Sequence, residues 1–152
     1  MSKNLKTKEK SCMFCVSDYH FEMMSLPYIS KKLEENEKIL ILTEEDLGNT
    51  INMLLEKTNL SSEKKEKILQ INWNKNNENK LEDIKKEENR RIEIFIKGKE
   101  DYINKMNNKI EEIGNNNIKI IDCYNIEEIN DHMDSILIRY NSLINTTGEK
   151  RV

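Results

Sequence analysis

Short aliphatic runs alternate along this chain with stretches in which apolar residues recur at helical spacing. The runs occupy residues 12–16, 38–42, 68–73, 91–96 and 118–122. Nearly continuous apolar runs of this length are typical of strands that are covered on both faces of a parallel or mixed sheet. We therefore predict five strands there, and a short sixth strand at residues 142–145.

Amphipathic segments between the runs predict helices. One begins near His20 and reaches residue 33, and we expect Pro27 to kink or split it. A second is predicted to begin with the capping-box-like residues 43–46 and to continue through residue 55. The three remaining helical segments are a charged turn at residues 63–67, a helix that ends at Gly114 as a left-handed cap, and a last helix over residues 126–137.

The rest of the chain is polar and lacks periodicity. We expect a flexible N-terminal tail at residues 1–10, a C-terminal tail at residues 146–152, and a single domain over residues 11–145. Residues 74–90 read as a mobile polar insertion, with a solvated helix around residues 80–88 as the alternative. Strands that alternate with crossover helices predict an α/β fold: a single-domain open, mostly parallel sheet of five or six strands with helices on both faces.

Composition excludes several functions. The chain has 152 residues, a charged fraction of 35% and a net charge of −3, so it lacks the basic field that nucleic acid binding requires. No run is long enough to cross a membrane, and the polar N-terminus has no export signal, so we expect a cytoplasmic protein with no membrane partner. Three cysteines in such a chain predict reduced thiols.

Motifs for catalysis and cofactor binding are absent from the sequence. There is no G-x-S-x-G elbow, and the four glycines stand too far apart for a phosphate loop or a dinucleotide fingerprint. We therefore expect no enzyme activity and no cofactor. Cys12 and Cys15 form a C-x-x-C motif, but residues three apart in a strand point to opposite faces, which favours two core cysteines. A metal site with His20 and Cys123, and redox chemistry, stay open as alternatives; the prediction is no metal.

The carboxyl ends of parallel strands are where open α/β sheets bind ligands. The candidate ligand-binding residues at these ends are Tyr19, His20, Thr43, Glu44, Trp73, Lys97 and Tyr124. Some of them have a purely structural alternative. Thr43, like Asp18, is also a typical helix cap, and Trp73 is also a typical core residue.

Five segments together resemble a known family. They are Leu-Pro-Tyr-Ile at residues 26–29, ILILTEEDL at 39–47, KILQINW at 67–73, IFIKG at 94–98 and IKIIDCY at 118–124. In their order and spacing they are similar to the MEDS sensory domains of DcmR-type regulators, over about residues 11–145. That family is a Rossmann-like, KaiC-related α/β domain without a working phosphate loop.

The resemblance implies a non-enzymatic sensory domain that binds a small metabolite and signals to a kinase or a transcription regulator. Many relatives have a histidine in the first strand, where this chain has Cys12 to Cys15. The alternative is a protein-interaction module, of the anti-regulator or antitoxin type, that binds no small molecule. It predicts an exposed apolar patch on Met23, Met24 and Tyr28. The oligomeric state, including a homodimer, stays open.

Overall fold

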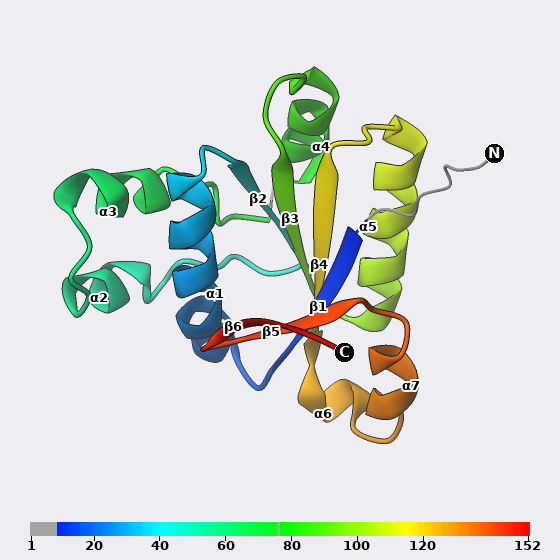
Figure 1. The fold of residues 1–152 in the computed structure, drawn as a ribbon. Coiled ribbons are helices and arrows are strands. Elements are labelled where there is room, and N and C mark those ends of the chain that lie inside the picture. The colour runs from blue at the N-terminus through cyan, green and yellow to red at the C-terminus, as the bar shows by residue number, and fades with distance from the viewer. Residues whose placement is uncertain (1–8, 76) are drawn as a thin grey trace.

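The computed structural model describes residues 9–75 and 77–152, which form a six-stranded sheet with the order β2-β3-β4-β1-β5-β6 (Figure 1). The strands are β1 (Glu9–Cys15), β2 (Lys38–Thr43), β3 (Ile92–Lys97), β4 (Ile118–Asn125), β5 (Ser142–Asn145) and β6 (Gly148–Arg151). Strands β1 to β5 pair in parallel, and β6 pairs antiparallel with β5. The predicted α/β fold with a mostly parallel sheet is therefore confirmed.

Helices cover both faces of this sheet. They are α1 (Asp18–Glu34), α2 (Ile51–Glu56), α3 (Ser62–Leu69), α4 (Asn77–Lys86), α5 (Glu100–Ile113), α6 (Ile126–Ile129) and α7 (Met133–Leu137). Buried residues of α1, α2 and α3 belong to one hydrophobic cluster, and those of α4 to α7 belong to a second. Figure 1 shows α1 and α5 on opposite sides of the central strands. The result is a three-layer arrangement of helices, sheet and helices.

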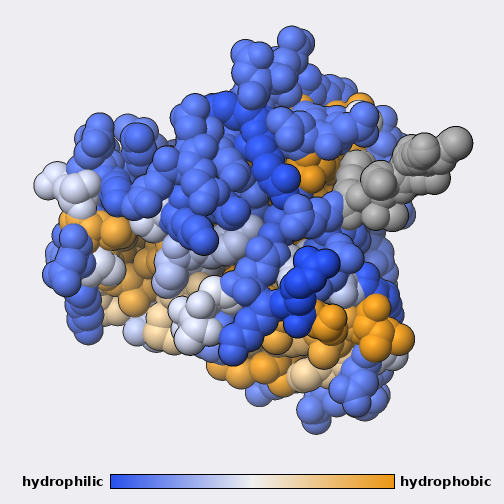
Figure 2. Space-filling view, in the orientation of Figure 1, coloured by the Kyte–Doolittle hydropathy of each residue, from blue (hydrophilic) through white to orange (hydrophobic). Residues whose placement is uncertain are grey.

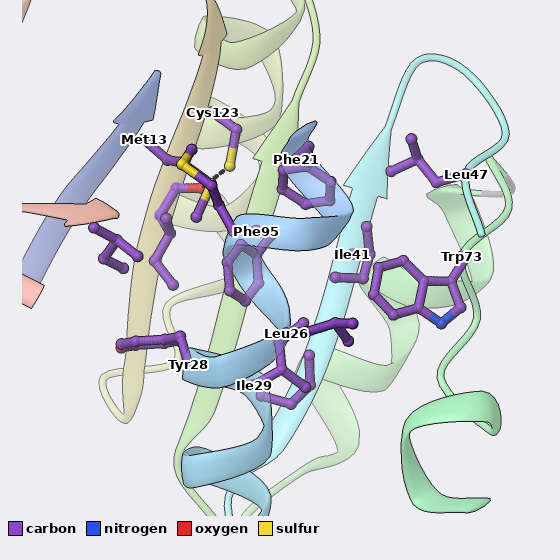
Figure 3. Packing of buried hydrophobic residues seen from close by; sticks show 14 of the residues in the cluster. Met13, Phe21, Leu26, Tyr28, Ile29, Ile41, Leu47, Trp73, Phe95 and Cys123 are labelled. Atoms are coloured by element: carbon purple, nitrogen blue, oxygen red, sulfur yellow. Dashed lines mark hydrogen bonds between the residues drawn. The ribbon is translucent and has the colours of Figure 1, made fainter. Parts of the chain in front are cut away.

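Alternation along each strand divides its side chains between the two clusters. In β1, Met13 and Cys15 face α1, whereas Cys12 faces α5. Under α1, the ring of Phe95 from β3 makes edge-on contacts with Phe21 at 5.9 Å and with Tyr28 at 6.0 Å between ring centroids (Figure 3). The prediction that the two cysteines of the C-x-x-C motif point to opposite faces is confirmed.

The strand predicted at residues 68–73 does not form. Ile68 lies in α3, and the residues that follow continue as an irregular segment. Trp73 is buried, its indole N–H donates to the carbonyl oxygen of Ile68 at 3.2 Å, and its ring lies beside Ile41 and Leu47 (Figure 3). A short apolar run does not distinguish a strand from the buried side of a helix and its exit. Trp73 is thus a core residue.

The helix predicted to begin at Thr43 begins later, because Thr43 still belongs to β2. Its hydroxyl accepts from the Glu45 N–H and donates to the Glu45 carbonyl oxygen, so it closes a local turn. The buried Glu22 of α1 instead fixes the turn that leads into α2. Its carboxylate accepts from the backbone N–H groups of Gly48 and Thr50, at 2.9 and 3.2 Å, ahead of α2. This turn is held by a residue far away in sequence, which no local pattern reveals.

The polar segment at residues 74–90 contains α4, whose Ile84 is fully buried. Lys80 of this helix is also buried and donates to the Ile41 carbonyl oxygen at 2.6 Å, on the edge strand β2. Unpaired backbone groups at a sheet edge need such a partner. A helix over this segment was the alternative prediction, and it is the one the structure adopts; residue 76 lies outside the described residues.

Three further differences concern the chain ends and single helices. The predicted N-terminal tail lies outside the described residues for positions 1–8, and Glu9 and Lys10 already belong to β1. Residues 126–137 form α6 and α7 in place of one helix, whereas α1 continues through Pro27 without division. The predicted C-terminal tail contains β6, which extends the sheet beyond the predicted strand β5.

Candidate ligand-binding site

A cleft of about 200 Å³ opens at the carboxyl ends of four parallel strands. Its lining residues follow or end β1, β2, β3 and β4: Cys15, Ser17, Asp18, Thr43, Glu44, Glu45, Lys97, Gly98, Lys99, Cys123, Tyr124, Asn125 and Glu128. Segments that are far apart in the sequence meet here because all four strands run in the same direction. Adjacent parallel strands thus bring their following loops to one place.

The topology favours a ligand site at this position. The chain leaves β1 through α1, on one face of the sheet, and leaves β4 through α6 and α7, on the other face. Strands β1 and β4 are neighbours, so their connections diverge and leave a crevice between them. In open α/β sheets, ligands bind in the crevice at such a topological switch point.

The turn between β1 and α1 is short, and its polar groups already form hydrogen bonds with side chains. Ser17 caps α1, accepting from the His20 N–H at 3.1 Å. Asp18 occupies the first turn, and its carboxylate accepts from the Lys97 ammonium group at 2.7 Å. Lys97 also lies over the ring of Phe21, with 5.9 Å to the ring centroid. A carboxylate therefore stands at the helix N-terminus, where a phosphate-binding protein would hold its ligand.

The turn after β3 is held tightly against the turn after β2. Glu44 Oε1 accepts from the Lys99 backbone N–H at 2.7 Å. Gly98 lies between them, and a Cβ atom there would come within 2.6 Å of Glu44 Oε1 and 2.7 Å of Tyr102 Cδ2. Glycine therefore permits the close approach of these two turns without displacing the Glu44 and Tyr102 side chains, and this approach forms one wall of the cleft.

The floor of the cleft is made of neutral groups. Cys15 and Cys123 belong to the same core cluster, and burial raises the pKa of Cys15 to about 12 and that of Cys123 well above its ordinary value. Both thiols are thus protonated at neutral pH, which makes them weak nucleophiles. Tyr124 also lines the cleft, and its hydroxyl is engaged elsewhere, in a hydrogen bond with the Tyr140 hydroxyl. The Tyr140 hydroxyl in turn donates to the buried Asp122 carboxylate at 2.6 Å.

Four of the seven predicted ligand-binding residues come together at the cleft: Thr43, Glu44, Lys97 and Tyr124. The other three do not line it. Tyr19 is exposed on α1, Trp73 lies in the core, and His20 accepts from the Val16 N–H through Nδ1 at 3.0 Å. Trp73 was placed at the cleft only because a strand was expected before it.

Prediction from the sequence missed several lining residues. Asp18, Gly98 and Lys99 follow predicted strands, so their position was visible, but nothing in the sequence showed the ion pair or the close approach that they make. Cys15 was predicted as a core residue and Cys123 only as a ligand in the alternative metal site, and both line the cleft. Lining residues beyond a strand end depend on how the turns fold back, which is not a local property.

Two other expectations concern metal binding and the surface. Within residues 9–75 and 77–152, no group of three or more histidine, cysteine, aspartate or glutamate side chains is placed to hold a metal ion. The apolar patch predicted on Met23, Met24 and Tyr28 is wrong, because Met24 and Tyr28 are buried and only Met23 is exposed. The helical repeat of α1 turns Met24 and Tyr28 toward the sheet and Met23 toward the solvent.

Comparison of the chain with protein-family models, with curated proteins and with solved structures finds no match. The fold and the cleft together define an open α/β protein with a candidate ligand site at its topological switch point. In the part of the chain that the structure describes, no helix combines the length and the apolar character needed to cross a bilayer.

Proposed function

We propose that this chain is a non-enzymatic sensory or regulatory domain that binds a small metabolite in the cleft and acts on a signalling partner in trans. The observation that carries the proposal is the cleft itself, at the carboxyl ends of four strands and at the switch point of the sheet. The resemblance to the MEDS sensory domains supports the same function. A kinase or a transcription regulator is the partner class, and the cytoplasm is the compartment in which such a domain would act.

The side chains of the cleft favour binding over catalysis. Its two cysteines have raised pKa values, and within residues 9–75 and 77–152 no histidine lines it. Nucleophilic catalysis by a thiol or hydroxyl group usually needs a neighbouring base. Lys97 is already paired with Asp18, and Glu44 with the backbone of Lys99. These groups are fixed in position, as a preorganised binding site requires.

A thermal-shift screen of the whole chain against a broad set of cytoplasmic metabolites tests the proposal. A ligand that binds only the folded state raises stability by about 2.7 kcal/mol at a concentration of one hundred times its Kd. We expect at least one such compound, and we expect the shift to be smaller in Gly98→Ala, whose Cβ displaces Glu44. Glu111→Ala, an exposed change on α5, is the matched control. A screen with no stabilising compound contradicts the proposal.

A protein-interaction module without a small ligand is the second candidate. One observation favours it: Val16, in the turn before α1, and Tyr19 and Met23, near the start of α1, expose apolar side chains, with Tyr19 at 43% and Met23 at 37%. Figure 2 shows hydrophobic residues gathered along the lower part of one face, below a hydrophilic upper part. If Tyr19→Ser together with Met23→Ser abolishes capture of a partner while the metabolite screen stays empty, this second function replaces the first.

A further inference from the structure

The turn between α1 and β2 holds the side chain of Glu37 against the sheet. Asn36 in this turn has a φ of 62°, a left-handed conformation that asparagine adopts more readily than most residues. The Asn36 N–H donates to the Leu33 carbonyl oxygen at 3.0 Å, and the Glu37 N–H donates to the Lys32 carbonyl oxygen at 3.1 Å. These two bonds close the end of the helix. Because Lys38 already begins β2, Glu37 is fixed from both sides.

Glu37 lies beside a second carboxyl group, that of Glu93 in β3. The two groups are within hydrogen-bonding reach of each other. Both also face the guanidinium group of Arg91, whose Nε lies 3.2 Å from Glu93 Oε2 and 3.8 Å from Glu37 Oε1. Two carboxyl groups this close do not ionise together without a large cost, because each charge disfavours the other.

Hydrogen bonds are distributed unequally over this pair. The buried Glu93 accepts from the Tyr28 hydroxyl at 2.6 Å and from Arg91 Nε at 3.2 Å, so its charge is well supported. Glu37 Oε1 is buried and accepts no hydrogen bond from any described residue, and Glu37 Oε2 lies 3.9 Å from Lys32 Nζ. A buried acceptor without a donor is costly. A proton on Glu37, donated to Glu93, removes that cost and makes Glu37 the acid of the pair.

The surrounding charges also leave room for one proton. Arg91 is already paired with Glu9 at 2.6 Å, and Lys32 is paired with the exposed Glu35 at 3.3 Å. Glu35 apart, the network that the structure describes holds four carboxyl groups, of Glu9, Glu37, Glu93 and Glu149, and three cationic groups, of Lys32, Arg91 and Lys119. One proton shared by two of the carboxyl groups makes this network neutral.

Glu37 also borders an open groove of about 440 Å³ that lies along β2, between the ends of α1 and α3 and the side of α4. Its side chain is 14% exposed, so water can exchange the proton. Burial, the hydrogen bond with Glu93 and the charge of Glu93 raise the pKa of Glu37 to about 8, against the opposing effect of Lys32 and Arg91. The other charged residues that line the groove are Lys38, which pairs with Glu87, and Lys67, Lys80, Asp83 and Arg90.

We propose that Glu37 shares one proton with Glu93 and so latches the turn after α1 to β3, and that loss of this proton in mildly alkaline solution releases the turn toward the groove. When the proton passes to a base in the solvent, the hydrogen bond between the two groups is lost and two carboxylates remain side by side. This latch goes beyond the proposed function. It lies at the amino end of the sheet, away from the cleft, and its test leaves the metabolite screen unaffected.

The latch makes stability depend on pH in a defined direction. The folded state keeps the proton up to about pH 8, whereas the unfolded chain loses it near the reference pKa of 4.5. The stabilisation is therefore complete below pH 4.5 and is lost as pH rises toward 8, with one proton taken up on folding in between.

Urea denaturation between about pH 5 and pH 8 tests this dependence with Glu37→Gln, whose carboxamide donates to Glu93 at every pH. Relative to this variant, the unfolding equilibrium constant of the parent should rise about tenfold per pH unit, the effect of one proton. Glu35→Gln, an exposed change beside the same Lys32, is the matched control and should keep the dependence of the parent. Equal dependence in the parent and in Glu37→Gln would overturn the latch.

A carbon-13 NMR titration of the parent decides the question even if Glu37→Gln does not fold. The carboxyl carbon of Glu37, assigned through its own side chain, should titrate with a midpoint near pH 8. The amide signals of Asn36 and Lys38 should shift with the same midpoint. A Glu37 midpoint near pH 4.5 would remove the shared proton, and amide signals that stay unchanged through the titration would remove the release of the turn.

Discussion

The two ends of the parallel sheet use charged residues in opposite ways. At the amino end, Glu9, Lys119 and Glu93 stand in register across β1, β4 and β3 on the α1 face, with alternating charge. Glu93 and Lys119 are buried, and the Tyr28 hydroxyl donates to Glu93 at 2.6 Å. At the carboxyl end, Glu45 and Glu128 stay exposed around a cleft. The buried, paired charges of Glu93 and Lys119 help to hold the fold together, whereas Glu45 and Glu128 form no salt bridge within the described residues.

The amino-end network also fastens the last strand. Glu149 of β6 accepts hydrogen bonds from Ser11, Ser142 and Lys119. Partial burial opposes its ionisation, but these hydrogen bonds outweigh burial and lower the pKa of Glu149 to about 2. A strand of four mostly exposed residues is thus attached to the sheet chiefly through one carboxylate and its pairing with β5.

The largest expected effect is a difference in stability between substitutions of two lysines, one at each end of the parallel sheet. Lys119→Met leaves the carboxylates of Glu9 and Glu149 without their buried partner, and we expect the free energy of unfolding to fall by about 3 kcal/mol. Lys99→Met, at the exposed rim of the cleft, should change it by less than about 0.5 kcal/mol. Urea denaturation measures both. Equal losses in the two variants would refute the contrast between the ends.

The second effect is the response of the amino end to acid. Because the pKa of Glu149 is about 2 in the folded state against 4.5 as its reference value, its contribution to stability is present above pH 4.5 and is lost as pH falls toward 2. Glu149→Gln should be less stable than the parent at pH 6, with a difference that narrows on acidification. Denaturation at a series of pH values measures it, and a pH-independent difference would contradict the assignment.

A smaller effect is expected at the wall of the cleft. Gly98→Ala places a methyl group against Glu44 and Tyr102, and moving these side chains should cost about 1 kcal/mol of stability. It should also reduce ligand stabilisation, whereas Lys119→Met should reduce stability without altering ligand affinity. Thermal denaturation with and without a ligand from the metabolite screen separates the two quantities. Undiminished ligand stabilisation in Gly98→Ala would place the site elsewhere.

Most of the sheet could be predicted because its strands are continuous aliphatic runs. β2, at Lys38–Thr43, and β4, at Ile118–Asn125, needed no tertiary information. The strand predicted before Trp73 was wrong because Trp73 is buried against α3 and β2 and not as part of a strand of its own. β6 was not predicted because Gly148–Arg151 has no apolar pattern; it is held by its pairing with β5 and by the hydrogen bonds of Glu149.

The candidate site was predictable in outline. Thr43, Glu44, Lys97 and Tyr124 were found because the ends of parallel strands converge. The hydrogen bonds from Glu22 to the turn before α2, and the approach that Gly98 permits between two turns, are contacts between remote segments. Thr43 is no helix cap because it still belongs to β2, and the approach at Gly98 shapes the cleft wall. Neither has a counterpart in local spacing.

Native mass spectrometry of the protein purified from its own or a related host tests the central claim most directly. The account predicts a retained small mass on the parent chain, and its loss or reduction in Gly98→Ala. The Glu111→Ala control, on the exposed side of α5, should retain the small mass as the parent does. A clean mass without ligand in the parent, together with a co-purified protein, would contradict the account and favour the interaction module.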